Sequence, residues 1–133
     1  MAQFTPGDHR STFGGNPLAA AVGEAALELL VRERLSERAR VRGNELLAKL
    51  RAIDHAGIVE VRGRGLLIGV EIDPAFASAR AVCEGLLERG VLSKDTHGTV
   101  VRFAPPLVVE SEHVDLAVDA LTDALRSLER GAR

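Results

Sequence analysis

The stretch IVEVRGRGLLIGVEI, residues 58–72, decides the fold of this chain. Apolar and polar residues alternate on both sides of a connection that contains two glycines, and a period of two predicts two strands joined by a tight turn. In the first strand, Val59 and Val61 are expected to share the face opposite Glu60. In the second strand, one face is expected to carry Leu66, Ile68, Val70 and Ile72.

Helical patterns precede this hairpin. Asn16 followed by Pro17 favours a helix start, because Asn is a good N-cap and Pro suits the first helical position. This apolar helix is expected to end near Arg32 or Glu33 and to dock against something outside this chain. A second helix is expected to begin at a Ser36 cap and to run to about Leu50, with its charged face exposed to solvent.

The elements that follow the hairpin are expected to be a helix over 75–89, a short strand at 91–92, a turn over 94–98, a strand over 99–103 and a last helix capped by Ser111. Consecutive strands with short links favour an α+β fold with a small, mainly antiparallel sheet and helices on one side. We expect residues 1–15 to form an extended lead-in, 16–33 a linking helix and 34–133 a small α+β domain.

Composition excludes several classes of protein. A length of 133 residues suits one domain, and a net charge of −2 argues against a nucleic-acid partner. Aromatic residues make up 3% of the chain, so we expect an aliphatic core and no stacking platform for single-stranded nucleic acid. Without a membrane-length apolar stretch or a signal peptide, the sequence predicts no membrane partner and a cytoplasmic location. The lone Cys83 is expected to be a buried core residue.

Two segments are candidates for binding small molecules. In the first, residues 11–17, the hydroxyls of Ser11 and Thr12 precede two glycines and a helix start, a combination typical of phosphate sites. The alternative is a capped helix start with a flexible lead-in. No base stands beside Ser11 to make it a nucleophile, and the four histidines are scattered, so no metal site is expected.

The second segment, residues 94–107, places Arg102 inside an apolar strand that two prolines end. An arginine there favours an anionic partner, since its planar fork suits a carboxylate. The sequence leaves two interpretations open. Arg102 is either a clamp for a substrate carboxylate or an edge-strand arginine paired with a nearby Glu or Asp.

Three motifs in order resemble the class-III pyridoxal-phosphate aminotransferases. They are STFGGNPL at 11–18, VRGRGLL at 61–67, and KDTHG running into RFAPPL between 94 and 107. The last of these is most similar to the ornithine aminotransferases of the family, and the acetylornithine group matches its lead-in less well. The resemblance implies the small C-terminal domain of a fold-type I pyridoxal-phosphate enzyme, preceded by a long linking helix.

The resemblance also implies roles for three residues. Thr12 would donate its hydroxyl to the cofactor phosphate of a neighbouring subunit across a dimer interface, and Ser11 would assist there. Arg102 would hold a substrate carboxylate and exchange with an acidic partner that lies upstream in the family.

The resemblance implies no catalytic residue in this chain. The chemistry needs a lysine that holds the cofactor aldehyde and moves a proton. Lys49 and Lys94 do not match its position, which in the family precedes the motif at 11–18. We therefore expect the N-terminal part of the same enzyme to be a partner, to bind most of the pyridoxal phosphate and to be required for activity.

The implied reaction moves the δ-amino group of ornithine to 2-oxoglutarate in a homo-oligomeric enzyme. Amino acids and 2-oxo acids would be the substrates. Three alternatives stay open at this point. They are an acetylornithine-type fragment, a non-catalytic remnant serving as a binding or scaffold module, and a complete small-molecule-sensing α+β domain.

Overall fold

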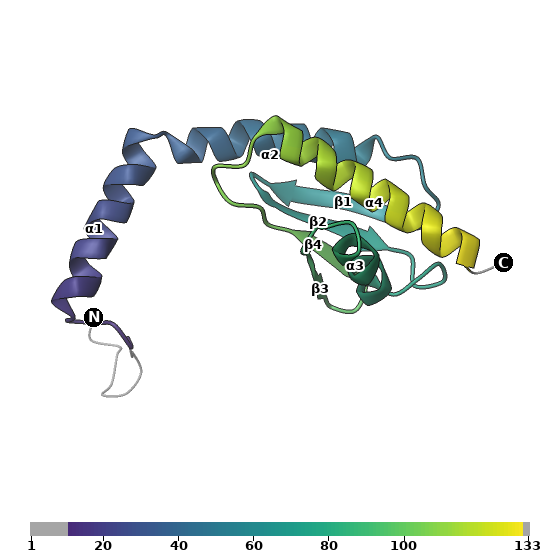
Figure 1. Ribbon diagram of the computed structural model, residues 1–133, viewed down its shortest axis with the longest axis horizontal. Helices are drawn as coiled ribbons and strands as arrows, with labels where there is room; N and C mark the ends of the chain where they lie inside the picture. The colour runs from purple at the N-terminus through teal and green to yellow at the C-terminus, as the bar shows by residue number, and fades with distance from the viewer. Residues whose placement is uncertain (1–10, 132–133) are drawn as a thin grey trace, which may run out of the picture. The chain divides into compact units, whose positions relative to one another are not determined.

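A computed structural model describes residues 11–131, so the first ten residues of the predicted lead-in lie outside the described part (Figure 1). The chain divides into two compact units, residues 1–35 and 36–133. The first unit contains helix α1 (Pro17–Arg32). As predicted, Asn16 caps this helix, its side-chain oxygen accepting hydrogen bonds from the backbone N–H groups of Leu18 at 2.9 Å and Ala19 at 3.3 Å.

Helix α1 has no buried residue. Its apolar side chains are exposed, with Leu18 at 73% and Val31 at 71% of their full accessible area. Such a surface on a helix is typical of an element that packs against another protein surface. Docking of α1 therefore stays a prediction.

Helix α2 (Leu35–Arg51) already includes Ser36, so the prediction of a Ser36 cap is wrong. Arg34 precedes it with a φ of 52°, in the left-handed region that ends a helix. One face of α2 approaches the β1–β2 turn very closely. A Cβ atom on Gly43 would lie 2.1 Å from the backbone oxygen of Gly65, so only glycine fits at position 43.

The predicted hairpin forms strands β1 (Ile58–Arg64) and β2 (Leu67–Ile72) of a four-stranded sheet. The order is β1-β2-β4-β3, and every pairing is antiparallel. The register shifts between Ile58 and Glu60, which takes Val59 out of the alternation and leaves it 62% exposed. The expectation that Val59 shares a face with the buried Val61 is therefore wrong.

Helix α3 (Ala79–Leu87) begins later than the predicted residue 75. Asp73 instead organises a turn, because its backbone oxygen accepts hydrogen bonds from the N–H groups of Phe76 and Ala77. The helix then begins after Ser78, whose hydroxyl accepts a hydrogen bond from the N–H of Ala81 at 3.2 Å.

The predicted strand at 91–92 is wrong, because Val91 donates its N–H to the oxygen of Leu86 and so closes the end of α3. The next strand, β3 (Lys94–Thr96), lies where a turn over 94–98 is expected. Only residues 97–99 turn, and His97 and Gly98 take left-handed φ values of 53° and 79°. The chain then returns along β4 (Val100–Phe103).

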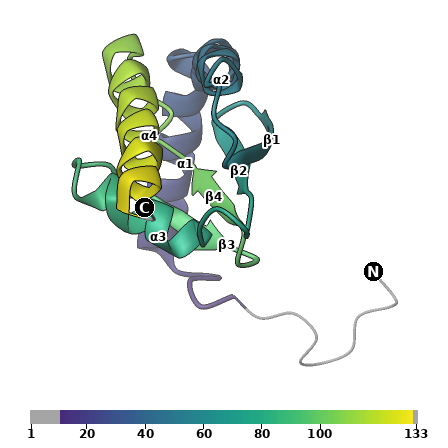
Figure 2. The same cartoon turned by 90° about the vertical axis from the view of Figure 1, so that its right-hand side faces the viewer.

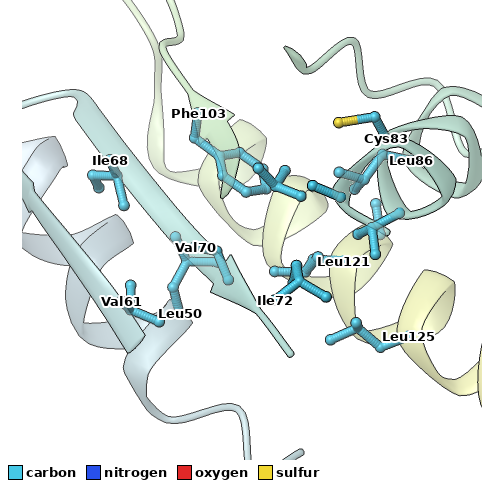
Figure 3. Close-up of a cluster of buried hydrophobic side chains, with 14 of the residues drawn as sticks. Leu50, Val61, Ile68, Val70, Ile72, Cys83, Leu86, Phe103, Leu121 and Leu125 are labelled. Carbon is cyan, nitrogen blue, oxygen red and sulfur yellow. The ribbon is translucent and has the colours of Figure 1, made fainter. Parts of the chain in front are cut away.

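Helices α2, α3 and α4 (Ser111–Gly131) lie on one side of the sheet, as predicted (Figure 2). Their apolar faces meet the sheet in an aliphatic core in which Phe103 is the one buried aromatic residue among those described (Figure 3). Cys83 belongs to this core, as predicted, and burial raises the pKa of its thiol. The largest fully buried side chains are those of Leu46, Leu50, Ile68, Ile72, Leu86, Leu121, Leu125, Val70, Val82, Val101 and Val114.

Part of the charged face of α2 contacts α4 and is not simply solvated, which corrects the expectation. Glu45 accepts hydrogen bonds from Lys49 at 2.8 Å, from Arg42 at 2.9 Å and from the hydroxyl of Ser111. Lys49 also pairs with Asp115 on α4. Lys49 and Ser111 together lower the pKa of Glu45 to about 2. Ser111 is the first residue of α4, so it does not cap the helix as predicted. Its hydroxyl instead donates a hydrogen bond to Glu45.

Candidate functional site

The phosphate-type motif lies in a tight turn that leads into α1. The N–H of Gly14 donates to the oxygen of Ser11 at 3.4 Å, and the N–H of Asn16 donates to the oxygen of Phe13 at 3.1 Å. Gly15 has a φ of 78°, which a residue with a side chain rarely adopts. Ser11 and Thr12 are both exposed, so their hydroxyls are accessible immediately before the helix N-terminus.

Arg102 lies in the middle of the sheet. Its strand β4 is flanked by β2 and β3, and its neighbours Val101 and Phe103 point into the core. Arg102 therefore projects from the opposite face, where it is exposed. It forms no ion pair within residues 11–131. The alternative of an edge-strand arginine paired with a nearby acid is wrong, because β4 is an interior strand and no acid among residues 11–131 pairs with this guanidinium.

A second arginine on the same face, Arg62, is ion-paired, unlike Arg102. Arg62 on β1 pairs with Glu60 at 2.8 Å and with Glu71 at 2.9 Å. Glu71 also accepts a hydrogen bond from the hydroxyl of Thr99 at 2.6 Å. Thr99 and Arg62 together hold the pKa of Glu71 below its usual range. These carboxylates are committed to Arg62, which leaves Arg102 available to a ligand.

Gly69 lies between the two arginines. It is the register partner of Arg62 on β1 and of Arg102 on β4. Because glycine has no side chain, the flank of Arg102 that faces β2 is open. Sequence reasoning did not connect Lys94 with Arg102, yet the structure pairs them directly across β3 and β4. No sequence signal could have found this pairing without the register of the hairpin.

Two other kinds of site were searched for along the described residues. Residues 11–131 contain no group of three or more His, Cys, Asp or Glu side chains placed to hold a metal ion. None of the helices formed by these residues is long and apolar enough to cross a bilayer.

The fold and site together define an α+β domain that covers one face of its sheet with helices. On the other face it presents an arginine that pairs with no acid in the part of the chain that the structure describes. The chain belongs to the class-III aminotransferase family, whose model matches residues 1–125. The resemblance seen in the three sequence motifs is thereby confirmed, as is the α+β fold of a pyridoxal-phosphate aminotransferase.

The chain is similar to the ornithine aminotransferase of Geobacillus sp. (strain WCH70), with 55% identity over 119 residues, 90% of this chain and 29% of that protein. It is also similar to the solved ornithine aminotransferase of Toxoplasma gondii, with a TM-score of 0.82 and 42% identity over 96% of this chain and 31% of that one. That structure has pyridoxal phosphate at partial occupancy in its active site.

Acetylornithine aminotransferase from Elizabethkingia anophelis is similar to the chain as well. The TM-score is 0.80 and the identity 41%, over 93% of this chain and 33% of that one. The chain thus spans about 29% of the length of the first curated relative and about a third of these solved structures.

Proposed function

We propose that this chain supplies the substrate-carboxylate clamp and a cofactor-phosphate contact of an ornithine δ-aminotransferase. The observation that carries the proposal is Arg102, an exposed guanidinium on an interior strand without an ion pair among the described residues. The full reaction would move the δ-amino group of ornithine to 2-oxoglutarate, giving glutamate 5-semialdehyde and glutamate.

Arg102 would bind and orient the substrate. Its guanidinium offers two parallel N–H donors, which fit both oxygens of one carboxylate. The buried neighbours Val101 and Phe103 fix its backbone, so the side chain projects from a defined position on the sheet. The strand ends at Pro105 and Pro106, which restrict the backbone directly after the clamp.

The residues at the start of α1 fit a phosphate group. Exposed hydroxyls at Ser11 and Thr12, followed by a left-handed glycine and a helix N-terminus, form a donor set suited to an anion. This donor set agrees with the role that the family resemblance implies, in which Ser11 and Thr12 would hold the phosphate of pyridoxal phosphate across a dimer interface. When bound, this cofactor supplies the electron sink for amino-group transfer.

We infer that neither lysine of this chain serves that cofactor. Lys49 is committed to Glu45 and Asp115, and Lys94 lies on β3 directly opposite Arg102. We propose that the lysine and most of the cofactor site belong to an N-terminal part of the same enzyme. The 29% coverage of the Geobacillus relative supports this division.

The test compares the chain alone with the chain assembled with an N-terminal part that carries the lysine. The expected result is no transamination alone, activity after assembly, and loss of that activity in Arg102→Glu. Arg126→Glu on α4, an exposed arginine outside the site, serves as the control and stays active. Turnover of ornithine by the chain alone, or near-normal activity of Arg102→Glu, would contradict the proposal.

A second candidate is an acetylornithine aminotransferase, which the 41% identity to the Elizabethkingia enzyme supports. Assaying the assembled enzyme with ornithine and with N-acetylornithine distinguishes the two. If an assembled enzyme with an intact lysine is inactive on both, the interpretation as a non-catalytic remnant is favoured.

A further inference from the structure

Lys94 and Arg102 form an uncompensated pair of positive charges. They are direct register partners across β3 and β4, and like charges in this position destabilise an antiparallel pair. Neither side chain forms an ion pair with any residue from 11 to 131. The strand pairing therefore brings together two cations that no acid among residues 11–131 compensates, which makes the pair suited to a bound anion.

The acids nearest to this pair are already committed. Glu60 and Glu71 lie on the same face but pair with Arg62. Asp95 follows Lys94 directly, but its register partner is the buried Val101, which places it toward the opposite face. Asp95 lies 3.6 Å from the guanidinium of Arg80 on α3.

There is also room for an anion beside the two cations. Lys94 and Arg102 line one surface hollow of about 490 Å³, together with Leu92, Ala104, Arg80 and Asp95. On the other flank of Arg102, Gly69 adds no side chain. A Cβ atom there would lie only 3.0 Å from a methyl group of Val100, so Gly69 keeps this part of the face clear.

We propose that Lys94 is a second anion-binding residue, which acts with Arg102 to favour doubly charged 2-oxo acids over singly charged ones. Arg102 alone can hold one carboxylate with its two-donor fork. Lys94 adds a point charge beside that fork, and its attraction is greater for a dianion than for a monoanion. This inference rests on the proposed role of Arg102 as the carboxylate clamp.

The test is a titration of the ¹⁵N-labelled 133-residue chain at low salt with two acids of equal carbon number. 2-Oxoglutarate carries two carboxylates and 2-oxopentanoate carries one. The amide chemical shifts of residues in β3 and β4, followed against the concentration of each acid, give the dissociation constant for that acid. Lys94→Gln is expected to weaken 2-oxoglutarate binding about threefold to tenfold and 2-oxopentanoate binding less than about twofold.

Two further variants separate binding from folding. Lys94→Arg keeps the charge and is expected to keep the preference for 2-oxoglutarate, whereas Arg126→Gln on α4 changes the binding of neither acid. The melting temperature of Lys94→Gln is expected to stay level or to rise, because a like-charge pair is removed. A lower melting temperature together with equal weakening for both acids would indicate a structural role and overturn the inference.

The outcomes also separate this inference from the proposed function. If Arg102→Gln weakens the binding of both acids but Lys94→Gln changes the binding of neither, the role of Lys94 is overturned. The proposed role of Arg102 as the carboxylate clamp is then retained. If the chain binds neither acid, or if Arg102→Gln does not change the binding of either acid, the inference about Lys94 fails. The carboxylate role of Arg102 is then decided separately, by the activity of Arg102→Glu in the assembled enzyme.

Discussion

Arg62 and Arg102 lie on the same face of the same sheet, on either side of Gly69, and their surroundings are opposite. Two carboxylates compensate Arg62, while Arg102 has no ion pair within the described residues. The comparison teaches that the structural and the ligand-binding arginine cannot be distinguished by exposure, since both side chains are exposed. They differ in whether the fold already supplies an anion.

The largest expected effect comes from the layer beneath both arginines. Ile68 is 1% exposed and Leu67, its neighbour on β2, is 61% exposed. Ile68→Ala should lower the free energy of unfolding by about 2–5 kcal/mol, because it leaves a cavity in the core. Leu67→Ala, the matched control, should change it by less than about 0.5 kcal/mol. Urea denaturation measures both, and similar losses would mean that the two faces are not distinct.

The second prediction tests the two arginines directly in the assembled enzyme. Arg102→Gln is expected to raise the KM for 2-oxoglutarate by about tenfold to a hundredfold, since a charged two-point contact is lost. Arg62→Gln is expected to change that KM less than about twofold, because its charge serves Glu60 and Glu71. Steady-state kinetics measure the KM of both variants. Equal increases in KM would show that the two arginines do not differ in substrate binding.

The smallest effect concerns another compensated group, Glu45 in the cluster between α2 and α4. Its folded pKa of about 2 lies below the ordinary 4.5, so its ionised form stabilises the fold above about pH 4.5. That stabilisation is lost as pH falls from about 4.5 to 2. Denaturation midpoints of the wild-type chain and of Glu45→Gln should differ at pH 7 and converge near pH 2. A difference that is constant with pH would exclude this role for Glu45.

The fold was predictable where a pattern has one dominant cause. The strand pair expected from the alternation in residues 58–72 and the Asn16–Pro17 helix start both depend on local chemistry, and both are confirmed, except that a register shift takes Val59 off the expected face. The prediction failed at 91–98, where Val91 bonds back to α3 and His97 adopts a left-handed φ. A long-range register then decides which residues pair, and local patterns do not contain it.

The candidate site was predictable to the same extent. The residue types and prolines around Arg102 left two interpretations open, a carboxylate clamp or an arginine paired with a nearby acid, because its possible partners could not be counted from the sequence. The structure shows that Glu71 bonds to Arg62 and Thr99, residues 9 and 28 positions away from it in the chain. Such commitments depend on tertiary contacts, and so does the pairing of Lys94 with Arg102.

The close approach of Gly43 to Gly65 limits how this chain can vary. A side chain at position 43 would push against the turn that joins β1 and β2, and β2 carries Gly69 beside Arg102. A substitution on a helix that contributes nothing to the clamp could thus shift the strand next to it. The residue allowed at position 43 consequently depends on the turn at position 65. Libraries that diversify α2 should hold Gly43 fixed.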